Sequence, residues 1–398
     1  MSAENIMPAI RFKGFSGEWC QSKLGEIVIY IVDNRGKNPK YYCSYGIPVI
    51  DNFMIKNDSY PNLKVASRFI DEYLFNNFIR NYNELDDVLI TLVGNNIGNI
   101  TLFPNEKSVI IQNTLGLRFS NNKKFMFYSL LFKNKKIVHL DRGMAQPSIR
   151  QDELLGIEIE LPLDETEQTK IGNYFQQLDT LIAQHQKKHD KLLNLKKSLL
   201  EKMFPKQGAT KPEIRFQGFS GEWEENEFSA IVSRQTAMSN EAELPRVEYE
   251  DIVSGKGELN KDIWEKESSK TGIKFEYADV LFGKLRPYLK NWLLPNFEGV
   301  AVGDFWVLRA SEKASEFVYF LIQTAAFEQA ANLSSGSKMP RSDWGLVSKT
   351  VFRIPAQITE QTKIGNLFKQ LDTLITQHQT QLKKLNNIKQ ACLEKMFV

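Results

Sequence analysis

Gln168 to Phe204 reads QTKIGNYFQQLDTLIAQHQKKHDKLLNLKKSLLEKMF, and nearly the same stretch returns as Gln361 to Phe397. The two copies lie 193 residues apart, and 25 of their 37 aligned residues are identical. Neither copy contains proline, and each has glycine only near its start. Because Leu, Lys and Gln favour helices, each copy is predicted to form one helix of about 55 Å, at 1.5 Å per residue.

Apolar residues recur every seven positions in both copies and form two sets. The first set is Ile171, Leu178, Leu192 and Leu199 in one copy and Ile364, Leu371, Leu385 and Cys392 in the other. The second set is Tyr174, Leu181 and Leu195, and then Leu367, Leu374 and Ile388. Such a repeat predicts that the two helices pair as a coiled coil.

The heptad is interrupted at the same place in both copies, by His185 in the first and by His378 in the second. Each histidine lies close to the midpoint of its helix. We therefore expect the two histidines to face each other in the helix pair, where a polar layer fixes the register. A parallel and an antiparallel pair would both align them, so the pattern leaves the direction of pairing open.

The chain is a tandem duplication, because a second motif also occurs twice. PAIRFKGFSGEW (residues 8–19) opens the first half, and PEIRFQGFSGEW (residues 212–223) opens the second. We call these two motifs the openers, and the segment between each opener and its long helix a head. The expected organisation is a first opener and head over 1–164, a helix over 165–204, a linker over 205–211, a second opener and head over 212–358, and a helix over 359–398.

Each head is predicted to be mixed α/β. Expected strands are 87–93, 109–111 and 155–161 in the first head, and 279–282, 300–302, 305–308 and 350–354 in the second. Helical spacing of apolar residues covers 125–139 and 314–331. The expected N-caps of the long helices are Asp164 or Thr166 in the first copy and Thr359 in the second. The predicted fold class is thus α+β, with two heads separated by two long helices.

The composition is that of a globular protein of two or three domains. The net charge is +3, and each helical stretch (165–206 and 359–398) by itself carries +3, so the heads are nearly neutral. This distribution is weak evidence for nucleic-acid binding. The three cysteines are scattered, and the sequence has neither a long apolar run nor a signal peptide, which predicts a cytoplasmic location.

The sequence contains no motif that predicts catalysis. GxxxxGK[ST], HExxH and paired CxxC motifs are all missing, so no catalytic or metal-binding residue is expected. The two heads instead contain polar loops with side chains suited to base edges, since Arg and Lys pair with guanine and Asn and Gln with adenine. The candidates are Asn95, Asn96, Arg142, Gln146, Ser148 and Arg150 in the first head and Lys284, Arg286, Tyr288, Asn291, Lys338 and Arg341 in the second. Each loop taken alone could be an ordinary polar turn, but two of them fall at equivalent places in the duplicated frame.

The chain resembles the specificity subunits of type I restriction–modification enzymes over nearly its whole length. The carriers are the two openers, EQTKI followed by LD in both helices, KMFP at 202–205, VLFGKLRPYL at 280–289 and MPR at 339–341. The resemblance implies two target-recognition domains, each reading one half of a split DNA site, and two long antiparallel helices that act as a spacer. It also implies docking of methylation subunits, two per complex, and it places S-adenosylmethionine, ATP and magnesium in the partners. Whether a restriction subunit is also a partner stays open at the level of sequence.

Two other functions stay open at the level of sequence. A duplicated coiled-coil scaffold that binds proteins without nucleic acid is favoured by the near-neutral heads. A nuclease with an unfamiliar site is the third. Salt-dependent binding of duplex DNA separates the first function from the scaffold, because contacts to phosphate weaken steeply with salt. Cleavage by the purified chain with magnesium alone would reveal a nuclease.

Overall fold

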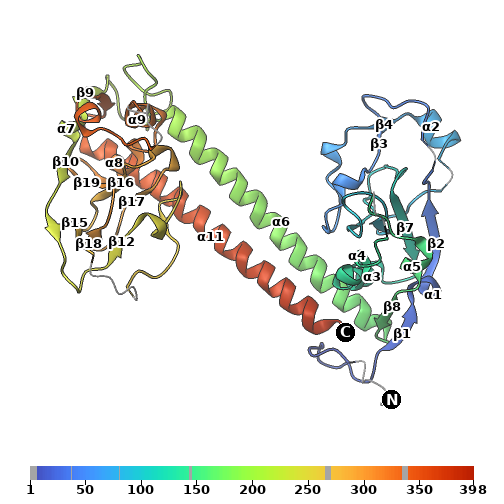
Figure 1. Ribbon diagram of the computed structural model, residues 1–398. Helices are drawn as coiled ribbons and strands as arrows, with labels where there is room; N and C mark the ends of the chain where they lie inside the picture. Colours follow the sequence, from blue (N-terminus) through green and yellow to red (C-terminus); the bar gives the residue numbers. More distant parts are fainter. Residues whose placement is uncertain (1–6, 37, 80, 143–145, 265–269, 334–338) are drawn as a thin grey trace. The chain divides into compact units, whose positions relative to one another are not determined.

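A computed structural model describes residues 7–36, 38–79, 81–142, 146–264, 270–333 and 339–398. The chain divides into two compact units: unit 1 is 1–186 with 380–398, and unit 2 is 187–379. Each unit contains one head, the beginning of one long helix and the end of the other. The long helices are α6 (Glu165–Lys202) and α11 (Ile358–Met396), coloured green and red in Figure 1.

The two long helices pair antiparallel. In unit 1, near the start of α6, Asp179 forms an ion pair of 2.5 Å with Lys389 near the end of α11. In unit 2, near the end of α6, Lys196 forms an ion pair of 2.6 Å with Asp372 near the start of α11. Contacts within each unit thus settle the direction that the heptad pattern left open, and they confirm the expected fold class.

The second heptad set is right at Tyr174, Leu367 and Ile388, which are partly buried and pack against the cores, and wrong at the other three positions. Leu181, Leu195 and Leu374 are each 43% exposed, whereas Phe175 and Phe368 are fully buried and Ile375 is 9% exposed. The first set is right: Ile171, Leu178, Ile364 and Leu371 are buried, and Leu192 and Leu385 are partly buried and pack against the cores. His185 and His378 are half-buried, and their facing each other stays a prediction.

The head of unit 1 is built on a four-stranded antiparallel sheet in the order β2-β7-β5-β6. These strands are β2 (Val28–Asp33), β5 (Val88–Thr91), β6 (Ile100–Leu102) and β7 (Thr114–Phe119). Separate two-stranded sheets join β1 (Cys20–Lys23) to β8 (Glu158–Leu161) and β3 (Ile47–Pro48) to β4 (Phe69–Ile70). The helices are α1 (Leu24–Ile27), α2 (Glu72–Asn77), α3 (Lys123–Phe132), α4 (Asn134–Val138) and α5 (Gln151–Leu155), with 3-10 turns η1 (Asn52–Met54) and η2 (Leu63–Val65).

The head of unit 2 repeats the four-stranded sheet, in the order β10-β19-β16-β17. Its strands are β10 (Val232–Gln235), β16 (Val280–Gly283), β17 (Trp292–Leu293) and β19 (Phe305–Ala310). The pair β9 (Glu224–Glu227) and β20 (Val351–Ile354) corresponds to β1 and β8. The helices are α7 (Phe228–Ile231), α8 (Ser315–Leu321), α9 (Ala325–Ala331) and α10 (Trp344–Val347), with 3-10 turns η3 (Tyr249–Asp251) and η4 (Pro287–Leu289).

The heads differ in the sheet added to this shared part. Unit 2 has a second four-stranded sheet, β11-β15-β18-β12, in which β12 and β18 pair in parallel. Its strands are β11 (Met238–Ser239), β12 (Arg246–Val247), β15 (Gly272–Phe275) and β18 (Gly299–Ala301), and a hairpin of β13 (Ile252–Val253) and β14 (Glu258–Leu259) lies beside it in the chain. The added sheet of unit 1 is the short β3-β4 pair. The same frame thus carries two different additions.

Several predicted elements need correction. Residues 109–111 form an isolated bridge, Val49 with Val109, and no strand. The helix predicted over 125–139 is split into α3 and α4, and that over 314–331 into α8 and α9, where Thr324 caps the second piece by accepting from the Phe327 amide. The strand predicted over 155–161 begins only at β8, because α5 occupies the residues before it.

The N-cap of α6 is Asp164, one of the two residues predicted. Its carboxylate accepts hydrogen bonds from the Thr166 amide at 2.8 Å and from the Thr166 hydroxyl at 2.6 Å. These bonds hold the pKa of Asp164 below its ordinary value. Thr359 was the wrong choice for α11, because that helix begins one residue earlier, at Ile358. The Gln357 carbonyl accepts the first helical hydrogen bonds there.

Each opener fastens the beginning of one long helix to the end of the other. In unit 1 the Arg11 guanidinium makes a bidentate ion pair with Glu167 at 2.6 and 2.7 Å, and the Ile10 amide donates to the Lys395 carbonyl at 2.8 Å. In unit 2 Arg215 pairs with Glu360 at 2.7 and 2.8 Å in the same way. Glu167 and Glu360 are fully buried, so each pair closes the base of its head over the helices.

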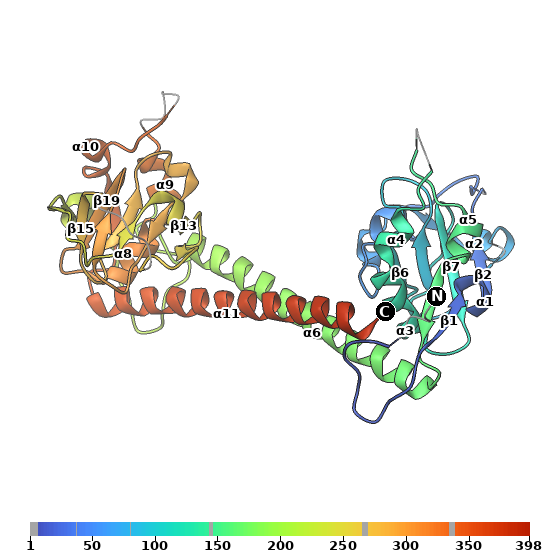
Figure 2. The same cartoon turned by 60° about the horizontal axis from the view of Figure 1, so that its bottom comes forward.

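A ring cluster fills the space between each head and its helices. In unit 1 Phe397 packs against Trp19, Phe125 and Phe175, and Figure 2 shows the end of the chain beside α3. The equivalent cluster of unit 2 consists of Phe204, Trp223, Phe317 and Phe368. Equivalent residues thus fill equivalent places where each head meets the long helices.

Candidate nucleic-acid interface

In unit 2 the structure brings together two loops that sequence reasoning found separately. Lys284 follows β16, and Arg341 belongs to the loop before α10. The Arg286 amide donates to the Pro340 carbonyl at 2.8 Å, and the Ser342 amide donates to the Lys284 carbonyl at 2.8 Å. Leu285 and Arg341 form a β-bridge between these two bonds. Lys284, Arg286 and Arg341 therefore come from one composite loop surface.

Unit 1 joins its two loops by the same bonds. The Gly94 amide donates to the Pro147 carbonyl at 2.9 Å, and the Ile149 amide donates to the Leu92 carbonyl at 2.8 Å. Val93 and Ser148 form the bridge between them. Pro147 and Pro340 are 193 residues apart, the spacing of the long helices. The candidate surfaces thus occupy equivalent places in the two heads.

The contents of the two surfaces differ. Unit 2 places Arg286 at φ +48°, a left-handed conformation, where unit 1 has Gly94 at φ +100°. A non-glycine residue in this region is strained. Pro287 follows at the first position of η4, and Tyr288 in that turn is 52% exposed. The Nε atom of Arg286 is buried and makes no hydrogen bond within the described residues.

The cations of unit 2 gather around one carboxylate. Arg341 donates to the Asp304 carboxylate from Nη2 at 2.9 Å and from Nε at 3.2 Å. Lys284 lies 3.6 Å from the other oxygen of Asp304. The Tyr249 hydroxyl donates to the Asp304 carbonyl at 2.6 Å and accepts from the Leu285 amide at 3.0 Å. Burial raises the pKa of the Tyr249 phenol, so the hydroxyl stays a donor.

Sequence reasoning missed Tyr249 and Asp304. Neither residue belongs to a recognisable motif, and Asp304 follows a glycine in a short turn between β18 and β19. Asn291, on the other hand, does not lie on the surface of the loop as predicted. This residue is 8% exposed, because Asn291 precedes β17 and its carbonyl accepts from the Gly283 amide at 2.7 Å. Lys338 lies outside the described residues.

Most candidate residues of unit 1 are exposed, and several form ion pairs or hydrogen bonds with other residues of unit 1. Arg142 pairs with Glu153 at 2.5 Å and Arg150 with Asp152 at 2.8 Å, with side chains 68% and 63% exposed. Asn96 is half-buried and donates to the Asn52 carbonyl at 3.3 Å. Asn95 and Gln146 are exposed, and Ser148 is half-buried and donates from its amide to Asp141 at 2.8 Å. Both surfaces therefore combine amide or guanidinium donors with carboxylates that hold the cations.

Known proteins match the chain over most of its length. Residues 16–194 match a family model described as the type I restriction modification DNA specificity domain. The type I restriction enzyme EcoDI specificity subunit of Escherichia coli is 21% identical over 420 aligned positions, which cover 96% of this chain and 86% of that relative. The structure of the type I restriction–modification S subunit from M. genitalium has a TM-score of 0.69 at 14% identity and covers 98% of this chain and 99% of that chain.

The chain belongs to the specificity subunits of type I restriction–modification systems. Members of this family recognise DNA and are not themselves catalytic. The family match therefore disfavours a protein scaffold without nucleic acid. The equivalent loop surfaces of the two heads contain Arg, Lys, Asn and Gln side chains, the types that can pair with base edges.

In the part of the chain that the structure describes, no three His, Cys, Asp or Glu side chains are grouped as metal ligands. The helices described there include none that is long and apolar enough to cross a membrane.

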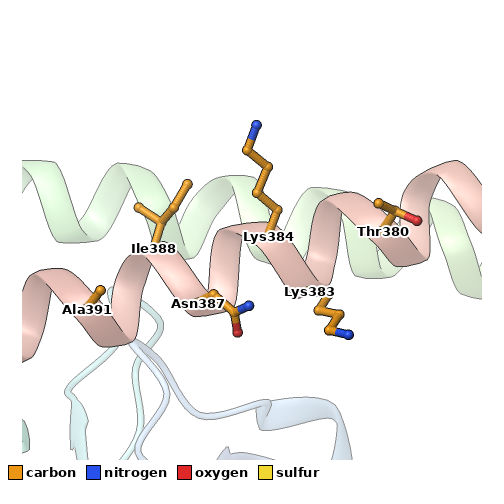
Figure 3. Close-up of a pocket in the computed structure, with 6 residues that line it drawn as sticks. All are labelled: Thr380, Lys383, Lys384, Asn387, Ile388 and Ala391. Atoms are coloured by element: carbon orange, nitrogen blue, oxygen red, sulfur yellow. The ribbon is translucent and has the colours of Figure 1, made fainter. Parts of the chain in front are cut away.

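A shallow hollow lies on the α11 face of this specificity subunit, within unit 1. Its lining residues are Thr380, Lys383, Lys384, Asn387, Ile388 and Ala391. Figure 3 shows Lys384 and Ile388 extending to one side of the helix and Lys383 and Asn387 to the other. Ile388 and Ala391 are the apolar residues of this lining, and a hollow on a single helix suits a second helix better than a small molecule.

Proposed function

We propose that the chain recognises a bipartite, asymmetric site in double-stranded DNA, each head reading one half, and directs methylation and restriction subunits to it. The observation that carries this proposal is the pair of equivalent loop junctions with unlike side chains. The junction of unit 1 presents Asn95 and Gln146, whereas that of unit 2 presents Lys284 and Arg341. Because the two junctions have the same backbone structure but different hydrogen-bond donors, the two heads are expected to recognise two different half-sites.

The division of labour within each surface follows from the chemistry of DNA. Cations that reach phosphates fix the position of the protein on the duplex but carry no sequence information. Guanidinium and amide groups that reach the major groove distinguish guanine from adenine. We expect Arg341 and Gln146 to act in the second way, since both are exposed, Arg341 is part of one bridge and Gln146 is two residues before Ser148 in the other.

DNA binding is tested with the chain in complex with its methylation subunit. The affinity for duplex DNA is measured at a series of salt concentrations, once with random sequence and once with the sequence that the complex methylates. The proposal predicts that the affinity falls steeply as salt is added. The logarithm of the binding constant should fall against the logarithm of the salt concentration with a slope of about 0.9 for each phosphate contacted. Salt-independent binding, or none, would overturn it. Cleavage of the DNA by the purified chain with magnesium alone would also contradict a non-catalytic role.

We propose two methylation subunits as partners, with the hollow on α11 as one docking surface. S-adenosylmethionine, ATP and magnesium would then be bound by the partner subunits, and the complex would act in the cytoplasm. The variant Ala391→Arg fills the hollow from an exposed position, and the neighbouring Gln390→Arg is its matched control outside the hollow. Loss of co-purification with the methylation subunit for Ala391→Arg alone is the expected result. Equal retention of both variants would exclude this surface.

A further inference from the structure

Asp304 connects both loops of the unit 2 surface. Its carbonyl accepts from the Lys284 amide at 2.9 Å, which fixes the start of one loop. Its carboxylate accepts from Arg341 at 2.9 Å, which holds the other loop. The same carboxylate lies 3.6 Å from the Lys284 ammonium. One residue thus sets the positions of two cations that sequence analysis selected as candidates for reading DNA.

The backbone around Asp304 is built to keep this arrangement. The Tyr249 hydroxyl bridges the Asp304 carbonyl and the Leu285 amide at 2.6 and 3.0 Å. Gly283 leaves room for this hydroxyl, because an added Cβ there would lie 2.9 Å from it. The Tyr249 ring packs against Phe305, the residue after Asp304, with ring centres 4.6 Å apart. The carboxylate is therefore presented from a fixed backbone.

Unit 1 has an uncharged residue at the equivalent place. There the Leu92 amide donates to the Asn113 carbonyl at 2.7 Å, just as the Lys284 amide donates to Asp304 in unit 2. Leu92 has no charge, and the candidate arginines Arg142 and Arg150 pair instead with Glu153 and Asp152 in α5. A central carboxylate is thus a property of the second surface.

A carboxylate between two cations has two physical effects. It weakens the local positive potential, so that phosphates of any sequence are attracted less. It also holds a guanidinium in one orientation, because two N–H groups of Arg341 share one oxygen of Asp304. Both effects favour base edges over phosphate as the partner of the cations.

We propose that Asp304 is a positioning residue that sets the sequence selectivity of the second head. It holds Arg341 and Lys284 for base edges and keeps them from binding phosphate indiscriminately. This inference rests on the proposed DNA-binding function, but it concerns the ratio of specific to random binding and not binding itself.

The test compares Asp304→Asn with the unchanged chain, each in complex with the methylation subunit. The substitution gives unit 2 the side chain that unit 1 has, and its amide can still be accommodated in the same space. For random duplex DNA, the slope of the logarithm of the binding constant against the logarithm of the salt concentration should steepen by about 0.9 for each cation that newly contacts a phosphate. Discrimination at one base pair of the second half-site should fall roughly tenfold, while the first half-site is read as before.

Two further variants control for charge and for folding. Asp343→Asn removes the same charge from the loop that contains Arg341 while keeping a side chain that caps α10, and it should leave both slope and discrimination unchanged. Asp304→Glu restores the carboxylate and should recover most of the selectivity. If the unchanged chain binds DNA and Asp304→Asn leaves slope and selectivity as they were, the inference on Asp304 is wrong. If the unchanged chain itself shows no salt-dependent binding, the proposed function fails instead.

Discussion

The aspartates that join the two long helices, Asp179 and Asp372, have different neighbours in the two units. In unit 1 the Asp179 carboxylate accepts from the Ser59 and Tyr128 hydroxyls, both at 2.7 Å, and pairs with Lys389. In unit 2 Asp372 pairs with Lys196, and the ring beneath that lysine is Phe320, which has no hydroxyl. Lys389 lies over the Tyr128 ring in the same manner.

This difference separates what the duplicated frame fixes from what it leaves free. The lysine–aspartate pair between the helices and the buried Arg–Glu pair of each opener occur in both units. The residues that the heads place beside the two aspartates differ. The added sheets and the loop surfaces differ as well. The frame therefore holds a head in place while the side chains within the head vary.

Removing the buried opener pair should give the largest effect, and an equal one in both units. Arg11→Ala leaves the fully buried Glu167 carboxylate without its ion pair, which costs about 3–5 kcal/mol of unfolding free energy. Arg215→Ala should do the same to Glu360 in unit 2. Hydrogen exchange of peptides from each head measures the local loss. The exposed pair of Lys206 and Glu213 is the control, and Glu213→Ala should change little. A loss confined to one unit would break the equivalence of the frames.

Tyr128→Phe should give the next largest effect, in unit 1 alone. The variant gives unit 1 the ring that unit 2 has and removes a hydrogen bond to a charged group, worth about 1.5–3 kcal/mol. Hydrogen exchange in α3 and a thermal unfolding curve measure it. Phe320→Tyr is the reciprocal variant, and it should stabilise unit 2 by offering Asp372 a donor. Destabilisation by Phe320→Tyr would show that the Asp372 site has no room for a hydroxyl.

Arg286→Gly should stabilise unit 2 by about 1 kcal/mol, because glycine adopts positive φ without strain, as Gly94 does in unit 1. Lys290→Gly is the matched control, since Lys290 has φ +57° in the same turn. Both variants should raise the melting temperature, but only Arg286→Gly should alter DNA selectivity. A lower melting temperature for Arg286→Gly alone would mean that the guanidinium is needed for folding.

The smallest expected effect is a dependence of stability on pH at Asp372. Burial raises the pKa of Asp372 above its ordinary value of 3.8, Lys196 opposes this, and Glu258 adds to it. Since the folded pKa is the higher one, the stability from this group is complete below about 3.8 and is lost as pH rises through the raised value. Asp372→Asn removes that loss, so its melting temperature relative to the unchanged chain should increase with pH across this window. A difference that stays constant with pH would contradict the raised pKa.

The heptad shows how far the sequence could predict the fold. The first set of positions is buried or packs against the cores, as at Leu178. In the second set, Leu181 and Leu374 are each followed by an isoleucine, Ile182 or Ile375, that is less exposed. A pattern along one helix contains no information about which side a head will cover. Tertiary packing therefore had to make that choice.

The candidate surface was predictable in its parts but not in its assembly. Arg286 and Arg341 were found by their residue types and by the duplicated frame. The two hydrogen bonds that join their loops lie between backbone atoms and have no signature in the side chains. Asn291 appeared equivalent to its exposed neighbours, yet the turn back into β17 buries it. Asp304 was missed because its importance comes from two cations that are distant in sequence.

The two-head claim is tested most directly by the methylation pattern of a host that expresses the complex with Gln146→Ala or Arg341→Ala. The prediction is a split recognition sequence in which Gln146→Ala relaxes one half and Arg341→Ala relaxes the other, each by about 1–3 kcal/mol of discrimination at one base pair. The half read by the unchanged head should stay as it was. Relaxation of the same half by both variants, or uniform weakening at all sequences, would contradict two heads that read separately.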